Sequence, residues 1–127
     1  MSFSVHQDSV RNGGQRLALS GRLDSTTAPQ FEQSVGNVLG SPPAILVFDM
    51  AGLEYISSAG LRIIFKLQKA VKGISGEVMM VNLQPPVRKV FEIIDALPSL
   101  SVFSSVAELD DYLDHMQAKE IEKHSGG

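Results

Sequence analysis

The apolar run from Ala44 to Phe48 constrains the fold more than any other feature of this sequence. Its side chains are apolar at every position, without the alternation of a half-exposed strand, and this pattern is typical of a strand covered on both faces. The segment Ser41-Pro42-Pro43 precedes the run and stops any helix that reaches this point. We therefore expect Ala44–Phe48 to be the central strand of an α/β domain.

Strand and helix patterns alternate on both sides of this run. A turn at residues 12–14 joins the first two expected strands, and each expected helix carries apolar residues on one face. The other expected strands are Phe3–His6, Arg16–Ser20, Glu77–Val81 and Leu100–Phe103. The expected helices are marked by Phe31, Val35, Val38 and Leu39, ending near Gly40; by Ile63, Ile64, Leu67 and Val71; by Val87, Val90, Phe91 and Ile94; and by Val106, Leu109, Leu113 and Met116. This order predicts a single α/β domain, with a mixed sheet of about four to five strands and about four helices packed against it.

The length and charge of the chain limit its organisation and its partners. With 127 residues it has about the commonest size of one domain, and we expect residues 1–118 to form that domain and residues 119–127 a flexible tail. The net charge of −3 disfavours nucleic acid and anionic membranes as partners. No run approaches the ~20 apolar residues of a membrane span, and the start lacks a signal-peptide pattern. A cytoplasmic monomer without membrane insertion is the simplest expectation.

Metal and thiol chemistry are disfavoured by composition. The chain has no cysteine, which removes disulfides, thiolate zinc sites and thiol nucleophiles together. Its three histidines, His6, His115 and His124, are scattered and form no metal-binding spacing. We therefore expect neither a metal nor a cofactor.

The most informative segment passes from the central strand into a helix that begins at Ser57-Ser58. A helix N-terminus carries unpaired N–H groups and a partial positive charge, so it can hold either an N-cap oxygen or a phosphate. Either serine can play either part. Local sequence alone favours the simpler explanation, in which Ser57 or Ser58 merely caps the helix and Gly60 only permits close packing.

Several segments resemble one known family. The segment from Asp49 to Arg62 resembles the signature of the STAS domain, the family of bacterial anti-sigma factor antagonists. Ser20-Gly-Arg-Leu-Asp24, followed by Thr27-Ala28, is similar to the family's "G-x-L-D, then T-A" stretch. Further similar segments are Gly76–Asn82 with Pro86–Phe91, at its next strand and helix, and Phe103–Leu109, at its end. The resemblance covers nearly the whole chain in the right order.

The resemblance implies a switch in partner binding. In that family the unmodified protein binds an anti-sigma factor, usually a serine kinase with a GHKL-type ATP fold, and so releases the sigma factor. Phosphorylation of one serine at the helix start ends the binding, and a metal-dependent serine phosphatase restores it. The resemblance places this phosphoacceptor at Ser58. Many members have Asp where this chain has Ser57, which makes Ser57 an alternative acceptor, and several have Ser or Thr where this chain has Ala59.

The same resemblance implies a partner-binding surface around this loop, formed by Asp24, Ser57, Ser58, Ala59, Gly60 and Arg62. From the residues alone, Asp24 is either a cap for the helix that starts near Thr27 or a contact beside the serine loop. Arg62 and Lys66 are either plain surface charges of an amphipathic helix or contacts for acidic residues of a partner.

Three other functions compete with this interpretation. A serine hydrolase is disfavoured, because Ile56 stands where the nucleophile elbow needs glycine, and we do not expect an enzyme. A receiver domain with Asp49 as phosphoacceptor is disfavoured, because the first strand is not followed by an acidic pair. STAS-like domains also resemble regulatory or structural subunits of lipid and anion transport systems, and this alternative stays open.

Overall fold

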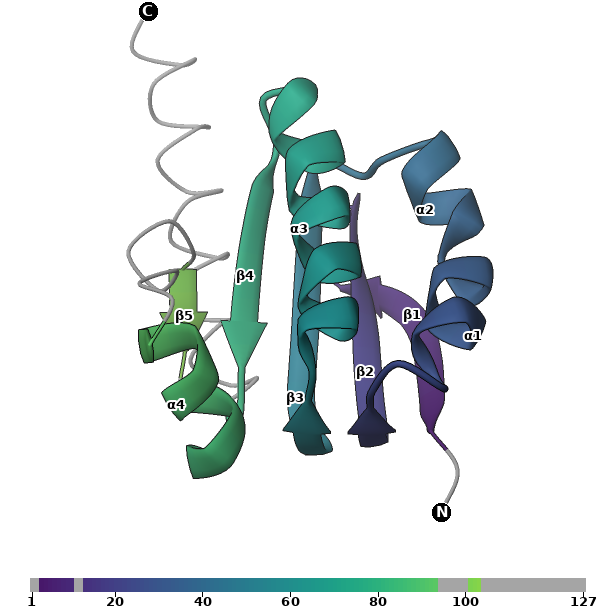
Figure 1. Cartoon of the computed structure of the whole chain (residues 1–127). Coiled ribbons are helices and arrows are strands. Elements are labelled where there is room, and N and C mark those ends of the chain that lie inside the picture. The colour runs from purple at the N-terminus through teal and green to yellow at the C-terminus, as the bar shows by residue number, and fades with distance from the viewer. Residues whose placement is uncertain (1–2, 11–12, 94–100, 104–127) are drawn as a thin grey trace, which may run out of the picture.

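Five strands and four helices make up the part of the chain that the structure describes, residues 3–10, 13–93 and 101–103 of a computed structural model. The strands are β1 (Ser4–Val10), β2 (Gly14–Leu23), β3 (Ile45–Ile56), β4 (Glu77–Val81) and β5 (Ser101–Phe103). The helices are α1 (Ala28–Ser34), α2 (Gly36–Gly40), α3 (Ser58–Gly73) and α4 (Pro85–Ile93). The α/β class expected from the sequence is confirmed (Figure 1).

The strands form one mixed sheet in the order β1-β2-β3-β4-β5. β1 and β2 are an antiparallel hairpin, whose turn contains Gly13 at a φ of 75°. β2, β3, β4 and β5 run parallel to one another. The apolar run Ala44–Phe48 thus marks the middle strand, as expected, and β3 continues beyond it to Ile56.

The described helices all pack on one face of this sheet (Figure 1). The core between them contains Leu46, Phe48 and Met50 of β3, together with Ile64 and Leu67 of α3. Two aromatic contacts fix its ends, since the Phe3 and Phe31 rings lie 5.6 Å apart and the Phe65 and Phe91 rings 6.5 Å apart, both edge to face. The core therefore packs α3 against the middle of the sheet.

The segment expected to be one helix ending near Gly40 forms two short helices instead. Val35 separates them, with φ −106° and ψ 13°. Its carbonyl oxygen accepts a hydrogen bond from the amide of Val38 at 3.0 Å, which tightens the turn, and Gly36, which follows it, has a low helix propensity. Phe31, Val35 and Val38 are all buried, so the apolar spacing alone did not reveal the break.

Some expectations lie outside the described residues. These are Ile94, Leu100 of the last expected strand, the terminal helix marked by Val106, Leu109, Leu113 and Met116, the domain boundary at residue 118 and the tail at residues 119–127. Within the described ranges, none of the helices combines the length and apolar character needed to cross a membrane.

Candidate functional site

The ends of β2 and β3 bring the two candidate loops together. These strands are parallel, and Leu23 and Ile56 are register partners at their carboxyl ends. The Ser57 amide donates a hydrogen bond to the Leu23 carbonyl oxygen at 2.8 Å. The turn that begins at Asp24 and the helix that begins at Ser58 therefore start side by side at one edge of the sheet.

The two serines have different surroundings at the start of α3. Ser57 is the N-cap, in an extended conformation, and its hydroxyl oxygen accepts a hydrogen bond from the Gly60 amide at 3.4 Å. Ser58 is the first helical residue, and its side chain is exposed. Its hydroxyl makes no hydrogen bond with any residue that the structure describes. The capping role that the sequence left open thus falls to Ser57, and Ser58 presents to solvent a hydroxyl that no described residue engages.

Removing the cap is expected to cost more stability than removing the exposed hydroxyl. Ser57→Ala leaves the Gly60 amide without its side-chain partner, which typically costs about 0.5–2 kcal/mol of unfolding free energy. Ser58→Ala is the matched control and should change it by no more than about 0.5 kcal/mol. Urea unfolding of both variants measures the difference, and equal losses would contradict this division of roles.

Ala59 and Gly60, the next two residues of α3, also differ in exposure and in role. Ala59 is partly buried and faces α1. Gly60 is buried, and a Cβ built on it would lie 2.5 Å from Cγ of Leu23. Gly60 therefore acts through packing, by letting α3 approach β2 closely, and offers no side chain to a partner.

Asp24 organises the turn that leads into α1. Its Oδ1 accepts hydrogen bonds from the Thr26 hydroxyl at 2.7 Å, the Thr26 amide at 3.0 Å and the Thr27 amide at 3.1 Å. In return, the Asp24 amide donates to the Thr27 hydroxyl oxygen at 2.9 Å. The Thr26 hydroxyl, aided by the two amides and opposed by partial desolvation, lowers the pKa of the Asp24 carboxyl. The Asp24 side chain thus holds the turn that precedes α1, whose N-cap is Thr27, and its predicted contact with a partner stays a prediction.

The lowered pKa of Asp24 predicts a loss of stability in acid. The charged carboxylate stabilises the fold above its unfolded-state pKa of roughly 4, and this contribution is lost as pH falls through the lower folded-state pKa. Asp24→Asn removes this titration, so its melting temperature should fall less between about pH 5 and about pH 3 than that of the parent. Glu54→Gln is the control, because Glu54 is exposed and has no hydrogen bond among the described residues. The same acid slope in the parent and Asp24→Asn would refute the assignment.

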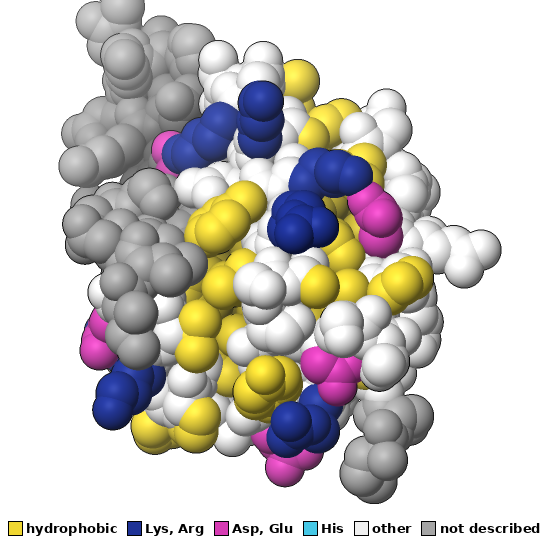
Figure 2. Space-filling view, in the orientation of Figure 1, with side chains coloured by type: hydrophobic (Ala, Val, Ile, Leu, Met, Phe, Trp, Pro, Cys, Tyr) yellow, Lys and Arg dark blue, Asp and Glu magenta, His cyan; other side chains and the backbone are white. Residues whose placement is uncertain are grey.

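A groove lies between α1 and α3, next to the serine pair. It has a volume of about 340 Å³ and is lined by Ser25, Ala28, Pro29, Glu32, Ala59, Arg62, Ile63 and Lys66. Lys66 and Glu32 form an ion pair across it. Figure 2 shows basic side chains gathered over α3 and apolar side chains exposed between α3 and α1. Of the predicted site residues, Ala59 and Arg62 line this groove, whereas Asp24 and Ser58 directly precede residues that line it.

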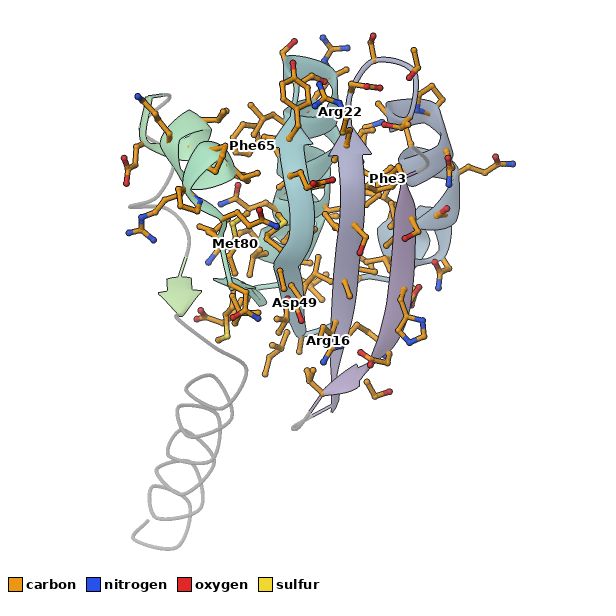
Figure 3. The ribbon with its side chains drawn as sticks, turned by 90° about the horizontal axis from the view of Figure 1, so that it is seen from below. Phe3, Arg16, Arg22, Asp49, Phe65 and Met80 are labelled. Atoms are coloured by element: carbon orange, nitrogen blue, oxygen red, sulfur yellow. The ribbon has the colours of Figure 1, made fainter. Side chains whose placement is uncertain are left out.

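Two further residues at this edge were not predicted. The Arg22 guanidinium lies 4.2 Å from the centre of the Tyr55 ring, on the neighbouring strand, and Tyr55 is 40% exposed. Figure 3 labels Arg22 near the end of β2. An exposed aromatic residue two positions before Ser57 was the available signal, but only the strand register shows that it meets Arg22.

Asp49, the phosphoacceptor of the rival receiver hypothesis, has a structural role. Only 9% of it is exposed. Its Oδ1 accepts hydrogen bonds from the Ala51 amide and the Asn82 side chain, both at 3.1 Å, and its Oδ2 lies 3.7 Å from Nε of Arg16 (Figure 3). These contacts occupy the carboxylate and leave it little access to a phosphodonor. The described residues also contain no cluster of three or more His, Asp or Glu side chains placed to hold a metal ion.

Comparisons with known proteins show the family and the fold to which this chain is similar. The model of the STAS domain family matches residues 8–109. BtrV of Bordetella bronchiseptica, provisionally named an anti-sigma factor antagonist, is 36% identical over 87 residues, which are 68% of this chain and 75% of BtrV.

Solved structures share the fold. An anti-sigma factor antagonist from Mycobacterium paratuberculosis superposes with a TM-score of 0.75 at 25% identity, over 91% of this chain and 95% of that chain. The anti-sigma factor antagonist SpoIIAA in its unphosphorylated form gives a TM-score of 0.72 at 17% identity, over 87% of this chain and 97% of SpoIIAA. The phosphorylated form of Bacillus SpoIIAA gives a TM-score of 0.67 at 16% identity, over 86% of this chain and 99% of that chain.

Proposed function

Since the chain belongs to the STAS domain family, we propose that it is an anti-sigma factor antagonist whose binding is ended by phosphorylation of Ser58. Its partner is an anti-sigma factor of the GHKL serine-kinase type, and a metal-dependent serine phosphatase restores binding. It acts in the cytoplasm as a binding protein and not as an enzyme. The names of BtrV and of the SpoIIAA structures, one of them phosphorylated, support this proposal.

The observation that carries the proposal is that the two serines have different structural roles. Ser57 holds the N-cap hydrogen bond, whereas Ser58 is exposed at the first position of a 16-residue helix. A kinase can therefore reach the Ser58 hydroxyl without breaking the helix start. Ser57 is the weaker acceptor, because modification there would remove the cap.

The effect of phosphate at this position follows from its charge. A phosphoserine adds about −1.5 to −2 charges at pH 7, and the N-terminus of α3 can tolerate them because it is the positive end of the helix. A partner surface shaped for a neutral hydroxyl cannot accept the same charge without a desolvation cost. Phosphorylation should therefore end binding while the fold survives.

Capture of the partner tests the proposal. Tagged parent, Ser58→Ala and Ser58→Glu proteins are expressed in the source organism, and retained proteins are identified by mass spectrometry. An anti-sigma factor with a GHKL-type fold should be enriched by the parent and Ser58→Ala proteins, and not by Ser58→Glu. Enrichment of a membrane transport component in its place would favour the transport-subunit alternative.

Phosphorylation of the chain should depend on Ser58. With the captured kinase and ATP, Ser58→Ala should accept no phosphate at this loop. Ser57→Ala, which keeps the exposed hydroxyl, should remain a substrate. Mass spectrometry locates the modified residue, and undiminished labelling of Ser58→Ala would move the acceptor to Ser57.

A further inference from the structure

The groove between α1 and α3 contains one cation with no partner among the described residues. Of the two basic residues that line the groove, Lys66 is already paired with Glu32. Arg62 is exposed and makes no hydrogen bond or ion pair with any residue that the structure describes. Its guanidinium is therefore available to a group that enters the groove.

The lining of the groove specifies what can enter. Ala28, Ala59 and Ile63 form an apolar floor, and the small alanine side chains allow close approach. A guanidinium binds a carboxylate through two parallel hydrogen bonds. The groove therefore fits a partner segment with an acidic side chain that pairs with Arg62. Small apolar side chains of the same segment would pack on the apolar floor.

Arg62 also stands one helical turn after Ser58. Residues four apart lie on the same side of a helix, with Cβ atoms about 6 Å apart, and an acidic group that precedes a basic one at this spacing is favourable. A phosphate on Ser58 can thus reach the Arg62 guanidinium. Lys69 is eleven positions after Ser58, or about 16 Å along the helix axis, and lies beyond that reach.

We propose that Arg62 binds a carboxylate of the anti-sigma partner in the groove between α1 and α3, and that a phosphate on Ser58 takes over the same guanidinium. Phosphorylation then ends binding in two ways, by adding negative charge at the surface and by removing the cation that the partner needs. This inference rests on the proposed function and names the chemistry of its partner contact.

Charge variants of Arg62 test the partner contact. The anti-sigma factor captured by the Ser58→Ala protein serves as the probe, and its affinity is measured by calorimetric titration. Arg62→Gln should weaken binding by about 10-fold and Arg62→Glu by about 100-fold, with unchanged circular dichroism. Lys69→Gln and Lys69→Glu are the matched controls and should bind nearly as tightly as the parent, because Lys69 is exposed on the same helix and does not line the groove.

The phosphate contact is tested without any partner. Phosphoserine is incorporated genetically at position 58, and its second pKa is followed by phosphorus NMR. Arg62 should hold this pKa down, so that Arg62→Gln raises it by about 0.3 unit, while Lys69→Gln leaves it unchanged. An unchanged phosphate pKa in the Arg62→Gln protein would overturn the switch.

The outcomes separate the two proposals. If Ser58→Glu abolishes binding while Arg62→Glu binds like the parent, the groove contact is wrong and the proposed function stands. If no anti-sigma factor binds the unmodified protein, the proposed function and the partner contact both fall, and the phosphate titration alone decides the Ser58–Arg62 pairing. If light scattering shows a dimer of the chain that Arg62→Glu dissociates, the groove belongs to a second copy and the inference is overturned.

Discussion

Replacement of Ser58 by glutamate is expected to weaken binding of the anti-sigma factor by about 100- to 1,000-fold. This loss corresponds to about 3–4 kcal/mol of binding free energy, which is within the cost of burying one unpaired charge at an interface. Ser58 is exposed beside the groove, so in the proposed complex the added carboxylate would face the partner. Ser58→Asp should act in the same direction, although a single carboxylate carries less charge than a phosphate and can mimic it incompletely.

The same substitution should leave the fold intact. The first turn of α3 contains no acidic residue, so a carboxylate at Ser58 meets the positive end of the helix without competition. This interaction contributes about 0.3–1 kcal/mol. The melting temperature should therefore stay the same or rise slightly, because the N-cap at Ser57 is untouched.

Calorimetric titration of the parent, Ser58→Ala and Ser58→Glu proteins measures the binding effect, with thermal melts alongside. Ser58→Ala should bind like the parent and escape regulation. Gln33→Glu is a control for added charge, because Gln33 is exposed on α1 and does not line the groove. Tight binding by Ser58→Glu, or a loss that merely follows unfolding, would show that the helix start is only a cap.

The strands could be predicted because their signals are local. Apolar side chains at every position from Ala44 to Phe48 require cover on both faces, and the structure places this run in the middle strand. The full length of β3 was not predictable in the same way. Its second half runs through Gly52, where a Cβ would lie 2.3 Å from Oγ of Ser20, and two register shifts adapt β2 to it. This close approach depends on the neighbouring strand β2. In the sequence alone, Gly52 is therefore indistinguishable from a glycine that marks a turn.

The candidate site was predictable in part for the same reason. Capping patterns identify a helix that starts at a serine pair. They do not decide which serine hydroxyl accepts the hydrogen bond from the Gly60 amide. The groove could not be predicted at all, since Glu32 and Lys66 are 34 positions apart and meet only because α1 and α3 start at the same edge of the sheet. Tertiary topology thus supplies the part of the site that local sequence lacks.

Gly60→Ala is expected to destabilise the protein although alanine is the better helix former. The added Cβ would lie 2.5 Å and 2.9 Å from two carbons of the Leu23 side chain and 3.2 Å from Ile56. Leu23 is fully buried among core side chains, so either its side chain or α3 must shift to admit the new Cβ. Overpacking of this kind costs about 1–3 kcal/mol of unfolding free energy. The gain of about 0.5–1 kcal/mol from helix propensity offsets only part of this cost.

Gly73→Ala provides the matched control in the same helix. Among the described residues, no atom beyond the chain neighbours of Gly73 and the backbone of its own helix lies within 4 Å of a Cβ built on it. The substitution should therefore be neutral or slightly stabilising, and urea unfolding should separate the two variants clearly. Shortening Leu23 to alanine should cost less in the Gly60→Ala background than in the parent, because the smaller side chain relieves the clash. Equal costs in the two backgrounds, or equal stabilities of Gly60→Ala and Gly73→Ala, would mean that Gly60 does not set the approach of α3 to β2.

The position of Ser58 and Arg62 at the groove depends on that approach, so a Gly60→Ala protein that remains folded should also bind the anti-sigma factor more weakly.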